Sequence, residues 1–485
     1  MQDLKGKTLA GLFWSLSERA GIQVVQFIVV IFLARLLNPE QFGLIGMLAL
    51  FIALAQTILD SGFGAALIQK TNATHLDECS IFYFNIFVGV LLSLALYFAA
   101  PLIAAFYNQP PLTALTRFLS LNILINAFGL IQTTLLARAL RFKTQIKANL
   151  FAVAASGAVG IGAALLGFGV WSLAIQSVSN TLFRTVALWW ICDWRPSLSF
   201  SLTSLRGMFG FGSRLLAAGL LNTFFDNLYQ AFIGKAFSAA SLGYYTRAFS
   251  MKIMAIDTTG ETLHRVMYPA LASIQNDVER LKRAYRKSMT LVTFVHFPLM
   301  LGLMVIARPL IVLLFSAKWE ASVPLFQLMC VAGLLYPLQV ENLEILKIKG
   351  RSDLFLKLEI IKKLMVVVSI FVTYRWGIQA MLTGNIVLTV ISYYLNSYYS
   401  GRLINYPLKA QVLDVLPSLI FAFLMGGSMW LAGYLLRSSH LFIQVAVPAG
   451  VGAGSYLALQ ILVKSESLAE IVKIARQLRL PTSAI

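Results

Sequence analysis

The chain has 485 residues, of which 58% are hydrophobic and only 12% charged, whereas soluble domains carry roughly 25% charged residues. A globular domain in water could not bury so much apolar side chain. The net charge of +19 does not indicate nucleic acid as a partner, because the Lys and Arg residues separate apolar runs instead of gathering on one solvated face.

Apolar runs of membrane-spanning length, about 20 residues each, follow one another along the chain. The first run follows a basic amino terminus without a cleavage site, so we expect a retained helix and not a signal peptide. A first group of six is predicted near residues 10–36, 43–68, 80–106, 113–136, 147–167 and 170–192. After the polar stretch 193–199, a second group is predicted near residues 207–233, 242–272, 289–315, 322–346, 356–374 and 377–400, and two more runs lie near 412–436 and 441–463. The prediction is an all-α polytopic membrane protein of about fourteen transmembrane helices.

Basic residues alternate between the two sets of connecting loops. One set, together with the two termini, holds 24 Lys and Arg residues, whereas the other set holds only five. Cytoplasmic loops of membrane proteins are enriched in Lys and Arg. We therefore predict that both termini are cytoplasmic, which requires an even number of helices.

The two six-helix groups repeat one another weakly. Residues 34–44 align with 234–244, residues 101–106 with 309–314, and residues 169–171 with 377–379. Because each group has six helices, equivalent helices keep their orientation, and the halves should be related by a pseudo-two-fold axis along the membrane normal. The predicted organisation is an N-terminal lobe (1–200), a C-terminal lobe (201–405), two further helices (406–463) and a cytoplasmic amphipathic tail (464–485), with the substrate between the lobes.

Catalytic and metal-binding signatures are absent from the sequence. It contains no G-x-x-x-x-G-K-[ST] phosphate loop, no H-E-x-x-H and no G-x-S-x-G. The three cysteines, Cys79, Cys192 and Cys330, lie far apart without zinc-site spacing. We expect neither an enzyme nor a resident cofactor, and H⁺ or Na⁺ remain as possible coupling ions in place of ATP.

Five segments carry a family resemblance: KTLAGLFWS at 7–15, LARLLNPEQFGL at 33–44, DSGFGAALIQK at 60–70, RVMYPALA at 265–272 and NDVERLKRAY at 276–285. With them the chain resembles the polysaccharide transporter family of the multidrug/oligosaccharidyl-lipid/polysaccharide flippase superfamily, in particular its Wzx-type exporters. The resemblance implies alternating access and an undecaprenyl-diphosphate-linked oligosaccharide, flipped across a bacterial inner membrane.

The same resemblance implies membrane lipids, a polymerase and a chain-length regulator as partners. Three alternatives stay open: a drug or cation antiporter of the same superfamily, a lipid II flippase, and a polysaccharide polymerase. The many basic residues within the spans argue against a cationic substrate, and a polymerase would be expected to have a larger loop outside the membrane.

The eighth predicted span carries the densest set of ionisable residues. Arg247, Asp257, Glu261 and Arg265 are spaced so that they share one helical face. A charge at mid-bilayer costs about 2.5–3.5 kcal/mol on insertion scales, so such residues usually face a cavity or the bundle interior. In one interpretation Arg247 and Arg265 bind the substrate diphosphate while Asp257 and Glu261 carry a coupling ion; in the other, the last three pair with one another near the headgroups.

Ionisable residues in other spans add further candidates. Arg19 and Arg184 are candidate substrate contacts, and Asp60, Asp226 and Glu341 are candidate ion-coupling groups. For Arg19 and Asp60 we favour a structural ion pair between neighbouring helices over direct contact with the substrate. Pro337, four residues before Glu341, predicts a break in the tenth span that would free backbone carbonyls.

Overall fold

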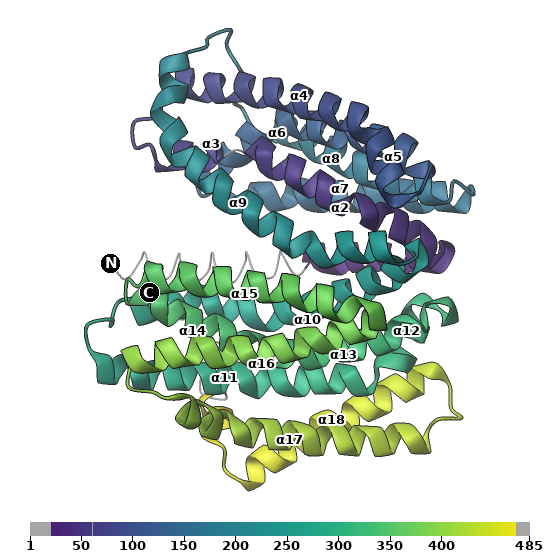
Figure 1. Ribbon diagram of the computed structural model, residues 1–485, viewed down its shortest axis with the longest axis vertical. Coiled ribbons are helices and arrows are strands. Elements are labelled where there is room, and N and C mark those ends of the chain that lie inside the picture. The colour runs from purple at the N-terminus through teal and green to yellow at the C-terminus, as the bar shows by residue number, and fades with distance from the viewer. Residues whose placement is uncertain (1–20, 61, 472–485) are drawn as a thin grey trace, which may run out of the picture. The chain divides into compact units, whose positions relative to one another are not determined.

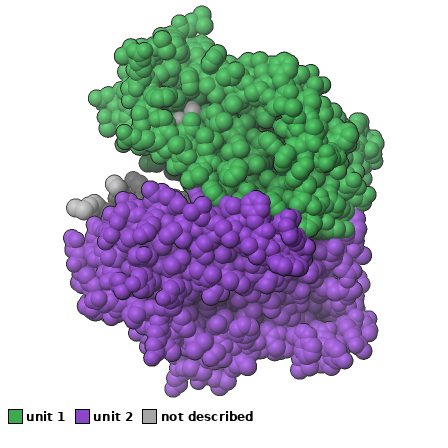
Figure 2. Space-filling model, viewed as in Figure 1, with its two compact units in different colours: residues 1–246 green, residues 247–485 purple. Residues whose placement is uncertain are grey.

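The computed structural model describes residues 21–60 and 62–471, and for residues 257–266 it describes the backbone only. Within these residues the chain is helical and has no strand. It divides into two compact units, Met1–Thr246 and Arg247–Ile485 (Figure 2).

The helices of the first unit run alongside one another (Figure 1). They are Gly21–Leu36, α2 (Pro39–Asp60), α3 (Phe63–Gln69), α4 (His75–Tyr107), α5 (Pro111–Leu119), α6 (Leu121–Arg138), α7 (Phe142–Leu165), α8 (Val170–Ile191), α9 (Leu202–Ala236) and the first turns of α10 (Ala239–Ala272). The close pairs are α2 with α9, α4 with α6, and α7 with α8. Aromatic and aliphatic side chains of α3, α4, α6 and α9, among them Phe63, Phe82 and Ile131, form a shared core.

The second unit contains the remainder of α10 and the rest of the helices. They are α11 (Val278–Val305), α12 (Ala307–Phe315), the 3₁₀ turn η1 (Ala317–Trp319), α13 (Ser322–Leu334), α14 (Tyr336–Ile348), α15 (Ser352–Thr373), the 3₁₀ turn η2 (Tyr374–Trp376), α16 (Ile378–Leu403), α17 (Leu408–Leu435) and α18 (Leu441–Leu462). Here α11 packs against α13 and α17, α16 packs against α14 and α15, and α17 packs against α18.

The predicted all-α polytopic membrane fold is confirmed. Each predicted span coincides with one helix or with two helices in succession, although the beginning of the first span lies outside the described residues. Among the described residues, nine helical segments are long and apolar enough to cross a membrane. The predicted break before Glu341 is also present, because α13 ends at Leu334 and α14 begins at Tyr336 with Pro337 in its first turn.

The division into two units differs from the predicted lobe boundary at residue 200. The units divide within α10, because α9 packs against α2, α3 and α4 of the first unit. The lobes 1–200 and 201–405 are defined by the sequence repeat. That the helices of one lobe correspond to those of the other remains a prediction.

Two helices of the first unit, α2 and the start of α10, approach each other at glycines. A Cβ added to Gly43 would lie 1.7 Å from the carbonyl oxygen of Ala239, and a Cβ added to Gly243 would lie 1.9 Å from that of Pro39. Only a residue without a side chain permits this approach. Since the repeat aligns residue 39 with 239 and residue 43 with 243, the contact is reciprocal: each glycine faces the carbonyl that precedes the other by four residues.

Candidate functional site

The most polar helices carry most of the predicted site residues. Arg184 lies on α8, Asp226 on α9 and Arg247 on α10, and none of these three helices is among the described segments that are apolar enough to span a membrane unaided. A helix of this composition is stable in a bilayer only where protein or water shelters its polar side chains.

In the first unit the structure brings Asp60 and Arg184 together. The Arg184 guanidinium donates through Nη2 to Oδ1 of Asn126 on α6 at 3.0 Å, and it attracts the Asp60 carboxylate at the end of α2. Asp60 also accepts a 3.4 Å bond from Gln56 one turn earlier. Asp60 is exposed and Arg184 is half-buried, so this charged pair remains accessible from outside the packed core.

Uncharged polar groups continue from this pair along α6, α7 and α8, where Asn122 and Ser156 are buried in the helix packing. Asn122 of α6 donates to Ser177 Oγ at 3.1 Å and accepts from Thr181 Oγ1 at 2.8 Å, and Asn180 donates to Ser156 of α7 at 3.1 Å. Amides and hydroxyls both donate and accept hydrogen bonds. They form a polar stripe within helices that are otherwise apolar.

The helix α9 adds polar groups opposite α2. The hydroxyls of Thr57 and Thr223 lie 2.8 Å apart, and Asp226, which is exposed, follows Thr223 by three residues and so lies close to it on α9. The structure therefore places Asp226 near the α2 and α9 contact.

In the second unit Arg247 is deeply buried. Its side chain is 5% exposed, and its guanidinium lies 5.2 Å from the ring centre of Phe315 and 5.3 Å from that of Trp319. Both aromatic residues are fully buried. A guanidinium over two desolvated rings is a strong cation–π arrangement, which gives Arg247 a packing role whatever else it contacts.

A second cation on α10, Lys252, was not among the predicted site residues. It is half-buried, with its ammonium 5.8 Å from the ring centre of Phe249 and close to Cys330 of α13. On the neighbouring helix α11, His296 bonds to the carbonyl oxygen of Gly333 at 3.0 Å. The sequence signal for Lys252 is its position inside an apolar span, off the face that carries Arg247.

Glu341 is buried inside the second unit. It is 5% exposed and accepts a 3.0 Å hydrogen bond from Ser288 Oγ of α11. Its neighbour Asn342 donates to Gln411 Oε1 of α17 at 3.1 Å, and Ser400 of α16 donates to Oδ1 of Asn342. Buried hydrogen-bonded side chains of this kind are costly to leave unpaired, so four helices are held in one arrangement around Glu341.

The polar line from Asn342 continues toward one end of the unit. Gln411 donates to the carbonyl oxygen of Tyr406 at 3.0 Å, and the Tyr406 hydroxyl donates to Asp414. Asp414 in turn accepts a 2.6 Å hydrogen bond from Arg286. Burial raises the pKa of the Tyr406 hydroxyl, so this group stays protonated as the donor to Asp414.

Four of the predicted site residues lack a described side chain. Arg19 lies outside the described residues, and for Asp257, Glu261 and Arg265 the structure gives only their place on α10. Their shared face, the pairing of Arg19 with Asp60, and their proposed roles stay predictions.

The family model and two curated relatives that match this chain are named for polysaccharide, teichuronic acid and lipopolysaccharide biosynthesis. Residues 32–324 match the model of a family described as "Polysaccharide biosynthesis protein". The chain is 28% identical over 475 residues to the teichuronic acid biosynthesis protein TuaB of Bacillus subtilis (strain 168), with 96% of this chain and 97% of that protein covered. It is 28% identical over 443 residues to the lipopolysaccharide biosynthesis protein WzxC of Escherichia coli (strain K12), with 87% and 88% covered.

Solved structures share the fold at low sequence identity. The lipid II flippase MurJ in an inward closed conformation superposes with a TM-score of 0.75 at 12% identity, covering 93% of this chain and 99% of that chain. An inward-facing multidrug resistance MATE family transporter of the MOP superfamily gives a TM-score of 0.63 at 15% identity, covering 79% and 95%.

Proposed function

The chain belongs to this family of polysaccharide biosynthesis proteins, and on that premise we propose that it flips an undecaprenyl-diphosphate-linked oligosaccharide from the cytoplasmic to the outer leaflet of a bacterial inner membrane. The family resemblance drawn from the sequence is confirmed, and so is the prediction of a transporter in place of an enzyme. The identity of the cargo and the direction of transport are the proposal.

The observation that carries the proposal is the half-buried guanidinium of Arg184. A guanidinium has five N–H donors in a fork that matches phosphate oxygens. Among the described residues, Arg184 makes one hydrogen bond, to Asn126, and is attracted by Asp60. The other N–H groups of Arg184 suit a diphosphate. The Asp60 carboxylate competes with the diphosphate for the Arg184 guanidinium and so favours release of the cargo.

The polar stripe around Arg184 suits a sugar. Ser177 and Thr181 are half-buried and place hydroxyl groups within two turns of Arg184, supported by the buried amide of Asn122. Sugar hydroxyls need partners that both donate and accept hydrogen bonds. A cationic drug would instead need acidic or aromatic groups, so this composition favours the oligosaccharide over the antiporter alternative.

In the second unit we assign the substrate-facing charge to Lys252 and a supporting role to Arg247. Lys252 is half-buried, whereas Arg247 is 5% exposed and packs on Phe315 and Trp319. Desolvation makes a fully buried cation a poor partner for a bulky, mobile headgroup. Arg265 remains a candidate at the other end of α10.

Transport requires an energy source, and the sequence lacks an ATP-binding motif. We propose coupling to H⁺ or Na⁺ through carboxylates within the spans. Glu341 is the first choice because it is buried and hydrogen-bonded by Ser288. The other candidates are Asp60, Asp226, Asp257 and Glu261.

The direct test is an assay of the lipid-linked intermediate in cells. Deletion of the gene should cause undecaprenyl-diphosphate-linked repeat units to accumulate on the cytoplasmic face and abolish the surface polymer. If the repeat unit were never assembled in the deletion strain, an enzymatic role would replace the proposed one.

The proposed orientation has its own test. Reporter fusions after Lys147, Arg286 and Arg402 should report the cytoplasm, whereas fusions near Ala239 and Ser438 should report the outer side. Two reversed reporters would contradict the orientation with both termini in the cytoplasm.

A further inference from the structure

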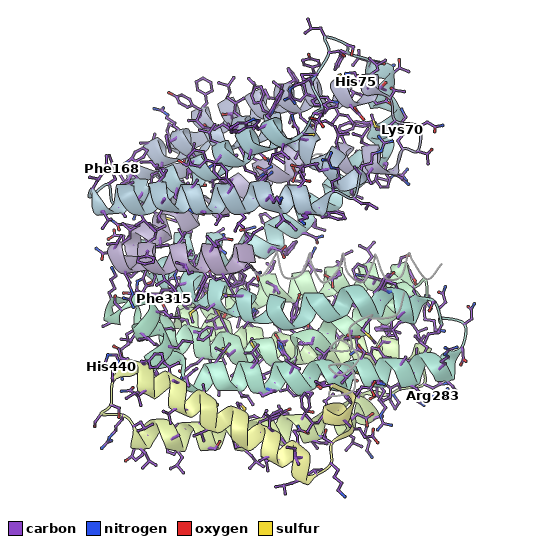
Figure 3. All side chains as sticks on the ribbon, turned by 180° about the vertical axis from the view of Figure 1, so that it is seen from behind. Lys70, His75, Phe168, Arg283, Phe315 and His440 are labelled. Carbon is purple, nitrogen blue, oxygen red and sulfur yellow. The ribbon has the colours of Figure 1, made fainter. Side chains whose placement is uncertain are left out.

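A pocket of about 890 Å³ lies at one end of the second unit, between α11, α17 and the end of α18. Arg283, one of its lining residues, lies at the opposite end of the unit from Phe315 and His440 (Figure 3). Its volume is within the roughly 300–1,000 Å³ typical of small-molecule sites. None of the residues that line it belongs to the polar surfaces of Arg184, Arg247 or Lys252.

The charged groups of the pocket do not fully neutralise one another. Two ion pairs, Arg286 with Asp414 at 2.6 Å and Lys287 with Glu470 at 2.7 Å, are internally balanced. The remaining charged lining residues are Arg283, Lys464 and Glu466. In the described part of the chain, neither Arg283 nor Lys464 forms an ion pair, so the pocket retains one positive charge in excess.

The pocket changes from charged to apolar with depth. Arg283 and Arg286 lie in the first turns of α11, whereas Leu291 follows Arg283 by eight residues, or about 12 Å along the helix axis. On α17 the apolar lining residues Leu413, Pro417 and Phe421 recur every four residues away from the helix start. A ligand that fits this gradient has an anionic head and an apolar tail.

A buried amide lies between the charged and apolar parts. Gln460, in the last turn of α18, lines the pocket and is only 1% exposed. Its Nε2 atom lies near the Tyr456 hydroxyl but forms no hydrogen bond of standard distance and angle with any described residue. A buried N–H donor without an acceptor is costly, and an ester or phosphate oxygen would satisfy it.

We propose that this pocket binds a membrane phospholipid with a singly charged phosphodiester headgroup, such as phosphatidylglycerol. The loops at this end of the unit are those that the charge pattern assigns to the cytoplasm, and basic pockets between transmembrane helices on that side are typical sites for anionic lipid headgroups. Arg283 and Lys464 bind the phosphate, Gln460 donates to an ester oxygen, and the acyl chains lie along Leu413, Pro417 and Phe421. The bound lipid joins α17 and α18 to α11.

The single excess positive charge of the pocket favours this phospholipid over the proposed cargo as the ligand. A diphosphate carries at least two negative charges, and with one excess cation the pocket would leave part of that charge unbalanced next to Glu466. A free phosphate would satisfy the cations but leave the apolar lining of α17 exposed to water. Binding should therefore need both the phosphodiester and the acyl chains.

The test uses the full-length protein, delipidated in a neutral detergent, and measures bound lipid by native mass spectrometry together with the melting temperature. Phosphatidylglycerol should remain bound and raise the melting temperature, whereas phosphatidylcholine and glycerol 3-phosphate should do neither. Each basic residue near an anionic headgroup contributes about fivefold in affinity. The double variant Arg283→Gln/Lys464→Gln should therefore bind phosphatidylglycerol about thirtyfold more weakly.

The matched control is Lys282→Gln/Lys409→Gln, which removes two positive charges from the first turns of α11 and α17, at the same end of the second unit, without altering the pocket lining. This control should keep the affinity of the unmodified protein. If both double variants weakened phosphatidylglycerol binding equally, the effect would come from the overall surface charge, and the proposed site would be wrong. A shift produced equally by glycerol 3-phosphate, or produced by undecaprenyl diphosphate and not by phosphatidylglycerol, would also overturn the assignment. None of these outcomes depends on which cargo the protein carries.

Discussion

Replacing Gly43 or Gly243 with alanine tests the helix crossing at the start of α10. The added Cβ would lie 1.7 Å from a backbone oxygen in the first variant and 1.9 Å in the second, whereas carbon and oxygen atoms rarely approach within about 3.0 Å. The obstacle is backbone, so no rotamer change relieves it. The two helices must move apart by about 1.3 Å in the first variant and about 1.1 Å in the second.

The expected decrease in the free energy of unfolding follows from two opposing effects. Overpacking costs typically 1–3 kcal/mol, and a backbone clash falls at the upper end of this range, whereas replacing a helical glycine by alanine gains about 1 kcal/mol in helix propensity. The net loss is about 2 kcal/mol. For a unit of about 250 residues, this corresponds to a decrease in melting temperature of roughly 4–8 °C.

The reciprocal geometry makes a sharper prediction for the double variant. Once the helices have separated to accommodate one alanine, the second alanine fits into the same gap. The clash of about 3 kcal/mol is then incurred once, whereas the helix-propensity gain of about 1 kcal/mol is obtained at both sites. Gly43→Ala/Gly243→Ala should therefore lose only about 1 kcal/mol and melt above either single variant, with a coupling free energy of about 3 kcal/mol between the two sites.

The assay is a thermal melt of purified protein in one detergent, monitored by tryptophan fluorescence. The control is Gly162→Ala in α7, where an added Cβ meets nothing within 4 Å, and it should melt at the same temperature or slightly higher. Additive decreases for the two sites, or single variants as stable as the unmodified protein, would refute the reciprocal close approach.

Three further variants test the assigned charges. Arg184→Ala should abolish most of the surface polymer at an unchanged protein level, Arg184→Lys should restore part of it, and Arg437→Ala, outside the polar stripe, should have no effect. Glu341→Gln keeps the hydrogen bond from Ser288 and should remove the pH or Na⁺ dependence of transport in proteoliposomes; an unaltered dependence would eliminate Glu341 as the coupling group. Arg247→Ala should lower the melting temperature, because each cation–π contact contributes about 0.5–2 kcal/mol, and loss of transport with a normal melting temperature would instead support direct contact with the cargo.

The fold was predictable because hydropathy and charge act locally along the chain. Runs of about 20 apolar residues must be helices in a bilayer, and the spacing of the runs gave the helix order. Helix breaks were predictable only where a proline or glycine marks them. Pro337 marks the break before α14, but α5 ends at Leu119 and α6 begins at Leu121 with neither residue type in the adjoining turns.

The site was only partly predictable, since helical periodicity gives the neighbours of a residue on its own helix and not on another. It placed Arg247 on a face with Asp257, but it contained no signal for Phe315 and Trp319, which lie about seventy residues away in sequence. Arg184 likewise contacts Asn126 across 58 positions. The repeat aligns Gly43 with Gly243, yet alignment cannot reveal that the two aligned segments pack on each other.

The distribution of charge among the helices indicates which of them serve the cargo and which serve the lipid. Arg184, Arg247 and Lys252 would together cost about 8–10 kcal/mol if they faced hydrocarbon at mid-bilayer, so α8 and α10 must turn these residues toward protein or water. In contrast, α17 and α18 are apolar enough to span a membrane, and many of their large apolar side chains are exposed. The charged lining that α17 and the segment after α18 contribute to the pocket lies at one end of these helices, where headgroups lie. We infer that the cargo is recognised on the polar helices, and that α17 and α18 anchor the second unit in the bilayer through the phospholipid bound at their base.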